Sequence, residues 1–339
     1  MEQQNIYIKQ FAELFKGKKI MYVHGFASSG QSGTVSRIRQ VLPGATVVAP
    51  DLPIHPQEAM DLLRKTCNTE QPDLIIGTSM GGMYTEMLYG YDRIVINPAF
   101  CIADTMGEHG MTGKQQFFSP RQDGVQEFYV DKALVKEYRT ITEQNFTKAS
   151  DQDEQHRVFG LFGDKDNLVN TRDLFCRNYL QGITFHGEHR MNDHSFMQSV
   201  VPVIRWIDDR QQQRERPIVY IGTETLMQHD TQPRPSMQKA VRTLIEHYQV
   251  FFVAFDTTAS ANSRIKDTLS EYIGVPAWGH TVFTNQRHLL YGDYLIQGES
   301  TMRWPDSDPA PMATSIELGS DTFKTWDDII EYFLRLGGQ

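Results

Sequence analysis

The feature that most constrains the fold of this chain is an apolar run that ends in a Gly-x-Ser-x-Gly turn. Residues 73–82 read Asp-Leu-Ile-Ile-Gly-Thr-Ser-Met-Gly-Gly, which predicts a buried strand, a sharp turn at Ser79 and then a helix. Glycine at positions 77 and 81 suits such a turn because the flanking backbone comes too close for a larger side chain. Ser79 is therefore the candidate nucleophile. The alternative is a glycine-rich loop with a bystander serine, since so short a pattern also occurs by chance.

A serine nucleophile needs a histidine to take its proton and a carboxylate to hold that histidine. The loop at 163–169 follows the next long apolar strand, and its G-x-x-D-x-x-V spacing resembles the acid loop of α/β-hydrolases. This predicts Asp166 as the acid, with Asp164 as the alternative, although a turn-forming role also explains Asp164. A further strand at 183–186 leads to His194 at the start of a helix, which we predict to be the histidine. The order Ser, Asp, His is that of the same fold.

The first strand, at 20–23, ends in a His-Gly loop. In α/β-hydrolases the corresponding loop supplies one backbone amide that stabilises the developing oxyanion, and the residue after the nucleophile supplies the other. We therefore predict that the backbone N–H groups of Phe26 and Met80 form the oxyanion hole. His24 is predicted to be a structural histidine whose ring hydrogen-bonds the loop.

Two alternative ligand sites are disfavoured by the residues themselves. The glycine spacing over residues 25–32 fits a phosphate-binding loop, but Gln31 occupies the position that needs a lysine. His186, Glu188 and His189 suggest a metal site, yet they fall on a strand end and a loop instead of one helix face. We predict no metal and no organic cofactor.

Residues from about 18 to 210 resemble the YqiA-like esterase family of α/β-hydrolases. This resemblance implies a compact hydrolase that cleaves carboxylic esters or thioesters, with Ser79, Asp166 and His194 as its triad. The matching segments are Tyr22-Val23-His24-Gly25-Phe26 with Ser28-Ser29, Pro50-Asp51-Leu52-Pro53, Gly77-Thr78-Ser79-Met80-Gly81-Gly82, Ile96-Asn97-Pro98-Ala99 and Asp193-His194-Ser195-Phe196.

Charge and cysteine content narrow the classes of partner. The 339 residues include 33 basic and 42 acidic ones, a formal charge of -9, which argues against nucleic acid or an anionic membrane as the main partner. Three widely spaced cysteines suit a reducing compartment, and no run approaches the ~18 apolar residues of a membrane span. We expect a cytoplasmic protein that acts on a small-molecule ester or thioester.

Apolar runs alternate with helical stretches, which predicts a mainly parallel sheet with helices on both faces, an α/β-hydrolase fold. The runs lie near 20–24, 46–49, 73–77, 93–97, 157–162 and 182–186. The stretch from about 101 to 155 is predicted to be a lid inserted over the site. A polar run closed by a proline predicts a domain boundary, giving a hydrolase domain at 1–210, a linker at 211–217 and a smaller α/β domain at 218–339.

The second domain resembles the 5'(3')-deoxyribonucleotidase branch of the haloacid dehalogenase superfamily. The resemblance rests on residues 281–284 and 289–296, with weaker support from the first strand and the last helix. It implies a Rossmann-like domain that belongs to a family of metal-dependent phosphatases.

The catalytic residues of that family are replaced here. The two aspartates at the end of the first strand fall on Gly222 and Glu224, and the acidic pair of the metal site falls on Gln297 and Gly298. The charge-balancing lysine corresponds at best to Arg287. Glycine cannot form an aspartyl-phosphate or bind magnesium through a side chain. We therefore interpret this domain as a pseudo-phosphatase that binds an unknown ligand or protein partner, or that is a purely structural appendage.

Two functional classes remain. The first is an active serine esterase or thioesterase fused to a catalytically dead domain. The second is a non-catalytic binding or scaffold protein with a relic hydrolase fold. Because Ser79, Asp166 and His194 occur in the required order, we favour the first. An active nucleotidase is disfavoured by Gly222 and Gln297.

Overall fold

The computed structural model describes residues 8–228, 232–298 and 311–337. The chain divides into two compact units, Met1–Gln212 and Gln213–Gln339, and each is considered by itself. Both units are built on mainly parallel β-sheets, so the predicted α/β class is confirmed. Within the described residues, no helix has the length and apolar character to cross a membrane.

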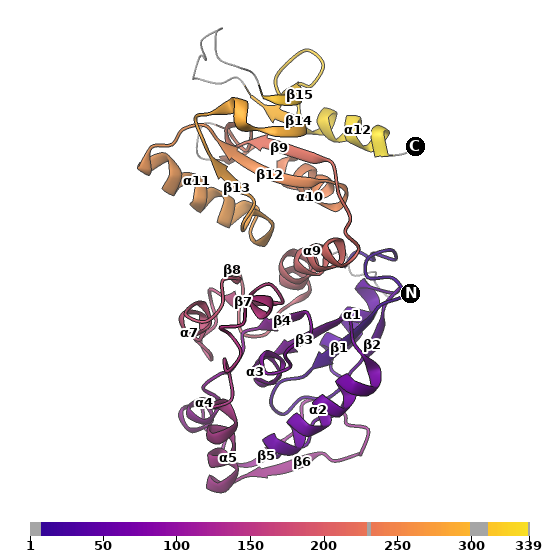
Figure 1. Ribbon diagram of the computed structural model, residues 1–339, viewed down its shortest axis with the longest axis vertical. Helices are drawn as coiled ribbons and strands as arrows, with labels where there is room; N and C mark the ends of the chain where they lie inside the picture. The colour runs from indigo at the N-terminus through magenta and orange to yellow at the C-terminus, as the bar shows by residue number, and fades with distance from the viewer. Residues whose placement is uncertain (1–7, 229–231, 299–310, 338–339) are drawn as a thin grey trace. The chain divides into compact units, whose positions relative to one another are not determined.

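The first unit contains a six-stranded sheet in the order β2-β1-β3-β4-β7-β8, in which every neighbouring pair is parallel (Figure 1). Parallel order places the carboxyl ends of all strands at one edge, where the loops that follow them meet. The strands are β1 (Lys19–Val23), β2 (Thr46–Val48), β3 (Leu74–Thr78), β4 (Arg93–Ile96), β7 (Val158–Gly163) and β8 (Gly182–Phe185).

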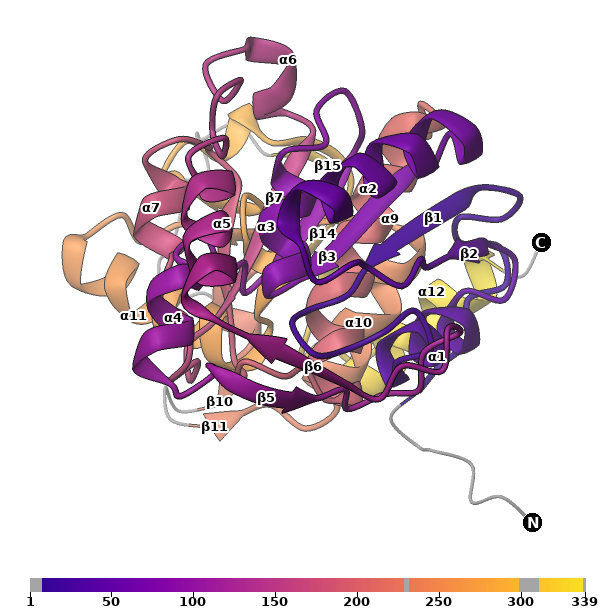
Figure 2. The same ribbon diagram turned by 90° about the horizontal axis from the view of Figure 1, so that it is seen from below.

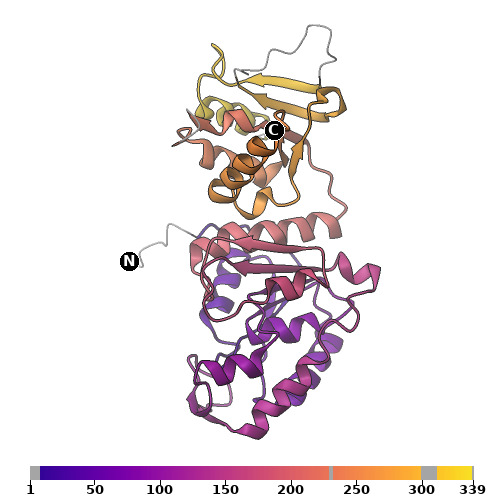
Figure 3. The ribbon, with the colours of Figure 1, turned by 90° about the vertical axis from the view of Figure 1, so that its left-hand side faces the viewer.

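Helices cover both faces of this sheet, because its strands carry apolar residues on both sides. On one face, α2 and α3 pack against Met21, Ile75 and Val95. On the other, α9 runs along the sheet (Figure 3). Its Trp206 contacts Phe159 of β7, with ring centroids 6.2 Å apart. The helices are α1 (Gly33–Val41), α2 (Pro56–Glu70), α3 (Met80–Glu86), α7 (Arg172–Cys176), α8 (Asp193–Ser195) and α9 (Val201–Gln211), with a π-helical segment (Phe196–Val200) joining the last two.

A long segment is inserted between β4 and β7. It contains an antiparallel hairpin and two helices that pack side by side, and its second helix also contacts α2 (Figure 2). Its elements are α4 (Ile102–Glu108), β5 (Gly113–Gln116), β6 (Glu127–Val130), α5 (Lys132–Thr142) and α6 (Gln152–Gln155).

The second unit contains a five-stranded sheet in the order β13-β12-β9-β14-β15, again parallel throughout. Residues of α10 and α12 form one apolar core with Val219 and Ile221 of β9. The elements are β9 (Ile218–Gly222), a 3-10 turn (Thr223–Thr225), β10 (Met227–Gln228), β11 (Gln232–Pro233), α10 (Met237–His247), β12 (Gln249–Ala254), α11 (Ala259–Tyr272), a 3-10 turn (Val275–Ala277), β13 (Thr281–Phe283), a 3-10 turn (Arg287–Leu289), β14 (Tyr291–Gln297), β15 (Met312–Glu317) and α12 (Trp326–Gly337).

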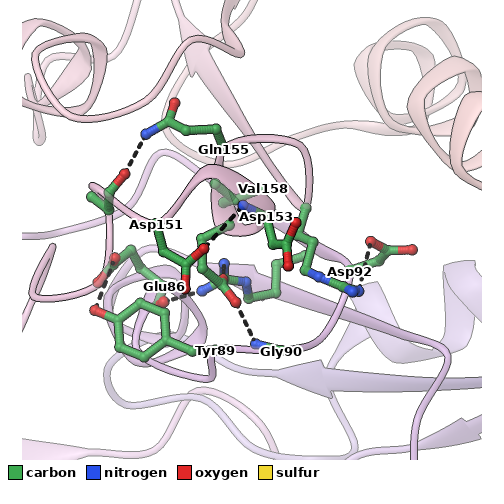
Figure 4. A network of polar contacts seen from close by, with 12 residues as sticks. Glu86, Tyr89, Gly90, Asp92, Asp151, Asp153, Gln155 and Val158 are labelled. Atoms are coloured by element: carbon green, nitrogen blue, oxygen red, sulfur yellow. Dashed lines mark hydrogen bonds and ion pairs between the residues drawn. The ribbon is translucent and has the colours of Figure 1, made fainter.

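A buried arginine joins the start of β4 to the end of the inserted segment. Arg93 is fully buried, forms an ion pair with Glu154 and donates to the carbonyl oxygen of Glu86. The Glu154 carboxylate also accepts from the backbone N–H of Gly90 at 2.7 Å (Figure 4). A buried charge is tolerated when it is paired and hydrogen-bonded in this way.

The carboxylate of Glu86 is the second buried acid of this region. It accepts from Asn145 Nδ2 at 2.8 Å, from the Phe146 N–H at 3.1 Å and from the Tyr179 hydroxyl at 2.7 Å. The bonds from Asn145 and Phe146 attach the inserted segment to α3, the helix that begins beside Ser79. Glu154 attaches the end of the same segment to β4 through Arg93.

The Arg93→Met variant tests this attachment. It leaves Glu154 buried without its cation, so we expect the free energy of unfolding to fall by about 3 kcal/mol. The matched control is Arg139→Met, which removes an exposed ion pair with Asp104 and should cost less than about 1 kcal/mol. Urea unfolding of the full chain, followed by circular dichroism, measures both. Equal losses would contradict the structural role of Arg93.

Candidate active site

Ser79 sits in a strained turn between β3 and α3. Its backbone has φ 55° and ψ -121°, a conformation that non-glycine residues rarely adopt. The turn is possible because its neighbours lack side chains. A Cβ atom at Gly77 would lie 2.2 Å from Thr85 Oγ1, and one at Gly81 would lie 2.0 Å from the carbonyl oxygen of Val23.

The side chain of Ser79 contacts a histidine on the loop after β8. His189 Nε2 lies 3.0 Å from Ser79 Oγ, and His189 Nδ1 lies 2.7 Å from Asp166 Oδ2. Asp166 is 2% exposed and His189 is 17% exposed, so the line of contacts runs from a buried acid to a half-buried hydroxyl. Nδ1–H donates to the carboxylate in this arrangement, which leaves Nε2 to accept the serine proton.

Asp166 is held by the loop that follows β7. Its Oδ1 accepts from the backbone N–H groups of Leu168 at 2.8 Å and Val169 at 2.9 Å, so Oδ2 is the oxygen that meets His189. Burial by itself raises the pKa of Asp166, but the bonds from His189, Val169 and Leu168 outweigh it and leave the pKa below its ordinary value. Asp166 is therefore ionised at neutral pH.

Asp164, the alternative acid, faces another histidine. Its Oδ2 lies 2.8 Å from His186 Nδ1, and its Oδ1 accepts from the Gly187 N–H at 2.9 Å. His186 and His189 thus have separate carboxylate partners. Across the described parts of the chain, no group of three or more His, Cys, Asp or Glu residues is arranged to hold a metal ion.

The structure corrects the predicted histidine. His194 is exposed on the short helix α8, and its Nε2 lies 2.6 Å from Gln198 Nε2, one turn further along the helix. Asn192 accepts from the Ser195 N–H at 2.8 Å and so fixes the start of this helix. His194 consequently belongs to the helix, and the structure brings His189 to Ser79 in its place. The sequence did contain a signal for this, because His189 lies in the loop directly after the strand.

Asn97 connects the acid loop with the histidine loop. It follows β4, is 1% exposed and adopts a positive φ of 43°. Its Oδ1 accepts from the Gly163 N–H at 2.7 Å, while its Nδ2 lies 3.1 Å from the carbonyl oxygens of both Glu188 and His189. One buried amide side chain therefore holds the backbone on both sides of the Asp166–His189 contact.

The two predicted oxyanion residues are both near Ser79. Phe26 is on the loop after β1 and lines the same cavity as Ser79, and Met80 is the first residue of α3. The first backbone N–H groups of a helix have no partner within it. A Cβ at Gly25 would lie only 3.3 Å from Ser79 Cβ, which shows how near the β1 loop passes.

His24 has the structural role expected of it. Its Nδ1 lies 2.9 Å from the carbonyl oxygen of Gly25, and its Nε2 accepts from the Leu52 N–H at 3.0 Å. Burial lowers the pKa of His24 to about 4, because the charged ring would lose its hydration. The neutral ring thereby joins the β1 loop to the loop after β2.

A cavity of about 420 Å³ adjoins Ser79 and His189. Part of its wall comes from the segment inserted between β4 and β7, the predicted lid. The residues of that segment that line the cavity are Ile102, Thr105, Met111, Gln115, Phe118 and Ser119.

In the second unit, the positions that the sequence analysis compared with phosphatase groups lie at the carboxyl ends of β9 and β14. Glu224 Oε1 accepts from the Gly298 N–H at 3.2 Å, and Arg287 Nη2 donates to Gln297 Oε1 at 2.8 Å. A Cβ at Gly222 would lie 2.3 Å from Glu224 Oε1. The Glu224 carboxylate therefore fills the space beside Gly222, and burial raises its pKa.

The order of the six-stranded sheet and the strained serine between β3 and α3 define the first unit as an α/β-hydrolase fold. The chain belongs to the uncharacterised protein family UPF0227, whose model matches residues 19–201. Among curated proteins, none matches the chain.

Several solved structures are similar to the first unit at low identity. An α/β hydrolase, MGS-MChE2, from the metagenome of sediments of the Mar Chica lagoon in Morocco has 13% identity and a TM-score of 0.36, covering 59% of this chain and 92% of that one. The esterase domain of a Rhodothermus marinus protein has 16% identity and a TM-score of 0.38, with 60% and 90% covered. Est1E from Butyrivibrio proteoclasticus has 16% identity and a TM-score of 0.37, with 58% and 88% covered.

The lowered pKa of His24 predicts a specific dependence of stability on pH. The unfolded ring binds a proton below about pH 6.5, whereas the folded ring stays neutral down to about pH 4. The contribution of the neutral His24 ring to the free energy of unfolding is therefore complete above pH 6.5. It is lost as the pH falls toward 4, by about 3 kcal/mol in total. We expect the difference in unfolding free energy between wild type and His24→Gln to change by this amount over that range.

His55 provides a control of opposite sign. It is half exposed, and the hydrogen bond that it donates to Glu137 raises its pKa. Its contribution to the free energy of unfolding is therefore present at low pH and is lost as the pH rises. The difference between wild type and His55→Gln should therefore shift in the other direction. A His24→Gln difference that stays constant from pH 7.5 to 4 would contradict the buried neutral ring.

Proposed function

We propose that the first unit is a serine hydrolase that cleaves carboxylic esters or thioesters, with Ser79, His189 and Asp166 as its catalytic triad. The observation that carries this proposal is the continuous line of contacts from Asp166 through His189 to Ser79 beside a cavity. A serine at a strained turn, a histidine in the correct tautomer and a buried ionised acid are the three parts that this chemistry requires.

The reaction follows from the atoms in contact. The Ser79 hydroxyl transfers its proton to His189 Nε2 as Oγ attacks the carbonyl carbon, and Asp166 stabilises the imidazolium that forms. The negative oxygen of the tetrahedral intermediate accepts hydrogen bonds from the N–H groups of Phe26 and Met80. His189 then protonates the departing alcohol or thiol, leaving an acyl group on Ser79. Water, deprotonated by the same histidine, releases the acid.

Two features support this function over that of a non-catalytic scaffold. The strained backbone of Ser79 costs free energy, and such strain is maintained where a function needs it. The buried carboxylate of Asp166 is likewise oriented toward His189 by two backbone N–H groups. A binding protein with a relic fold has no need of either arrangement. We further propose that the segment at 101–155 acts as a lid whose residues set the acyl and alcohol preference.

For the second unit we propose the role of a pseudo-phosphatase domain that binds a ligand or partner without phosphoryl transfer. Gly222 has no side chain to form a phosphoenzyme, and the Glu224 carboxylate fills the adjacent space. The side-chain oxygen of Gln297 accepts a hydrogen bond from Arg287. Gln297 also lacks the negative charge with which a carboxylate binds a magnesium ion. The resemblance to nucleotidases over residues 281–284 and 289–296 supports the domain type.

Hydrolysis of chromogenic esters graded by acyl length, and of acyl-coenzyme A thioesters, tests the proposal. We expect Ser79→Ala and His189→Asn each to lower kcat by about 10⁴-fold or more, because members of a triad act as a unit. His194→Asn is the matched control, since it changes a histidine five positions away on the exposed face of α8. Its kcat should stay within about twofold of wild type.

Three outcomes are informative. Loss of activity in His194→Asn with retention in His189→Asn would overturn the assignment of the histidine. No turnover above Ser79→Ala on any substrate would favour the binding-protein function instead. Activity retained in a chain that ends near residue 212 would show that the second unit is not needed for the chemistry.

A further inference from the structure

The cavity beside Ser79 has an uneven charge distribution. Of the described residues that line it, Arg37 and Arg190 are charged cations, and none is an aspartate or glutamate. The whole chain has a formal charge of -9, so its overall field repels anions. A cavity lined by one sign of charge concentrates the field within it. The two arginines therefore give the lining of this cavity a positive charge, whereas the chain as a whole is negative.

Arg37 is held in a defined orientation. It lies on α1 with only 16% of its side chain exposed, and its Nε donates to Asp193 Oδ1 at 2.6 Å. The guanidinium also lies over the ring of Phe196, 5.7 Å from the centroid. The ion pair uses Nε, whereas a carboxylate or phosphate binds well to the two terminal amino groups. Asp193 thus orients the guanidinium without lining the cavity.

Arg37 lines the same cavity as the reacting hydroxyl. Tyr22, Thr78 and Ser79 also line this cavity, and the Tyr22 hydroxyl lies 2.7 Å from Thr78 Oγ1. A group bound at Arg37 therefore lies in the cavity that the Ser79 hydroxyl also faces.

Arg190 adds a second charge beside the histidine. It directly follows His189 in the chain, and its guanidinium lies over the ring of Phe118, 5.1 Å from the centroid. Both Arg190 and Phe118 are exposed, so this pair lies at the solvent side of the cavity. The remaining wall is apolar in part, with Ile102, Met111 and Leu168.

We propose that this cavity selects esters or thioesters whose acyl chain carries a terminal anion, a carboxylate or a phosphate, bound by Arg37 and Arg190. The inference rests on the proposed hydrolase function and specifies its substrate class. The apolar wall accommodates the methylene groups between the ester and the anion.

A matched pair of esters tests the inference. The anionic ester is the 4-nitrophenyl monoester of glutaric acid, and the neutral one is 4-nitrophenyl pentanoate, which has the same chain length. We expect the full-length protein to show a kcat/KM about tenfold higher for the anionic ester, as one charge-assisted hydrogen bond allows. The preference should shrink at high salt if the guanidinium groups cause it. Competition by inorganic phosphate and by glutarate distinguishes the two anions.

Arginine variants show which residues cause the preference. The ratio of the two kcat/KM values should fall about tenfold in Arg37→Gln and also fall in Arg190→Gln, and Arg37→Lys should restore part of it. The matched control is Arg39→Gln, on the same helix but outside this cavity, which should keep the wild-type ratio. Arg190 is exposed, so Arg190→Gln keeps the test valid if Arg37→Gln unfolds.

The outcomes separate the inference from the proposed function. Turnover of both esters at equal kcat/KM, or a preference retained in both Arg37→Gln and Arg190→Gln, would overturn the anion subsite and leave the hydrolase intact. No turnover of either ester above Ser79→Ala would overturn the hydrolase itself, and the subsite with it.

Discussion

The arrangement of the first unit depends on one steric constraint, the close approach of three backbone segments around Ser79. The turn between β3 and α3 is possible only because Gly77 and Gly81 leave room for Thr85 and for the carbonyl oxygen of Val23. Gly25 lets the β1 loop pass close to Ser79 in the same way. The strained conformation of Ser79 is thus set by packing at the centre of the sheet. The loops that carry Asp166 and His189 also converge on Ser79.

Asp166 and His189 lie in loops and not in helices. Hydrogen bonds to the backbone of these loops fix their positions. Asn97 holds the end of β7 on one side and the loop after β8 on the other. Two backbone N–H groups orient Asp166, and the neutral ring of His24 joins the loops after β1 and β2. Such bonds need no helix and leave no periodic pattern in the sequence.

The strands of the six-stranded sheet were predicted well from the sequence. The histidine that contacts Ser79 was not, because His194 was predicted and His189 makes the contact. The strands expected near 20–24, 93–97 and 157–162 match β1, β4 and β7 to within a residue or two, because buried parallel strands are nearly continuous apolar runs. The β5–β6 hairpin was not predicted, since residues 113–116 are polar and show no alternation. His189 was missed because several histidines follow β8, and only the bonds of Asp164, Asp166 and Asn97 decide which one meets Ser79.

The central claim is that Ser79 is a nucleophile activated by His189. The most direct test is reaction of the full-length protein with a fluorophosphonate, followed by mass spectrometry of the intact chain and of its peptides. We predict one adduct per chain, located on Ser79, that forms far more slowly in His189→Asn and at the wild-type rate in His194→Asn. No adduct, an adduct on another serine, or equal rates in wild type and His189→Asn would contradict the account.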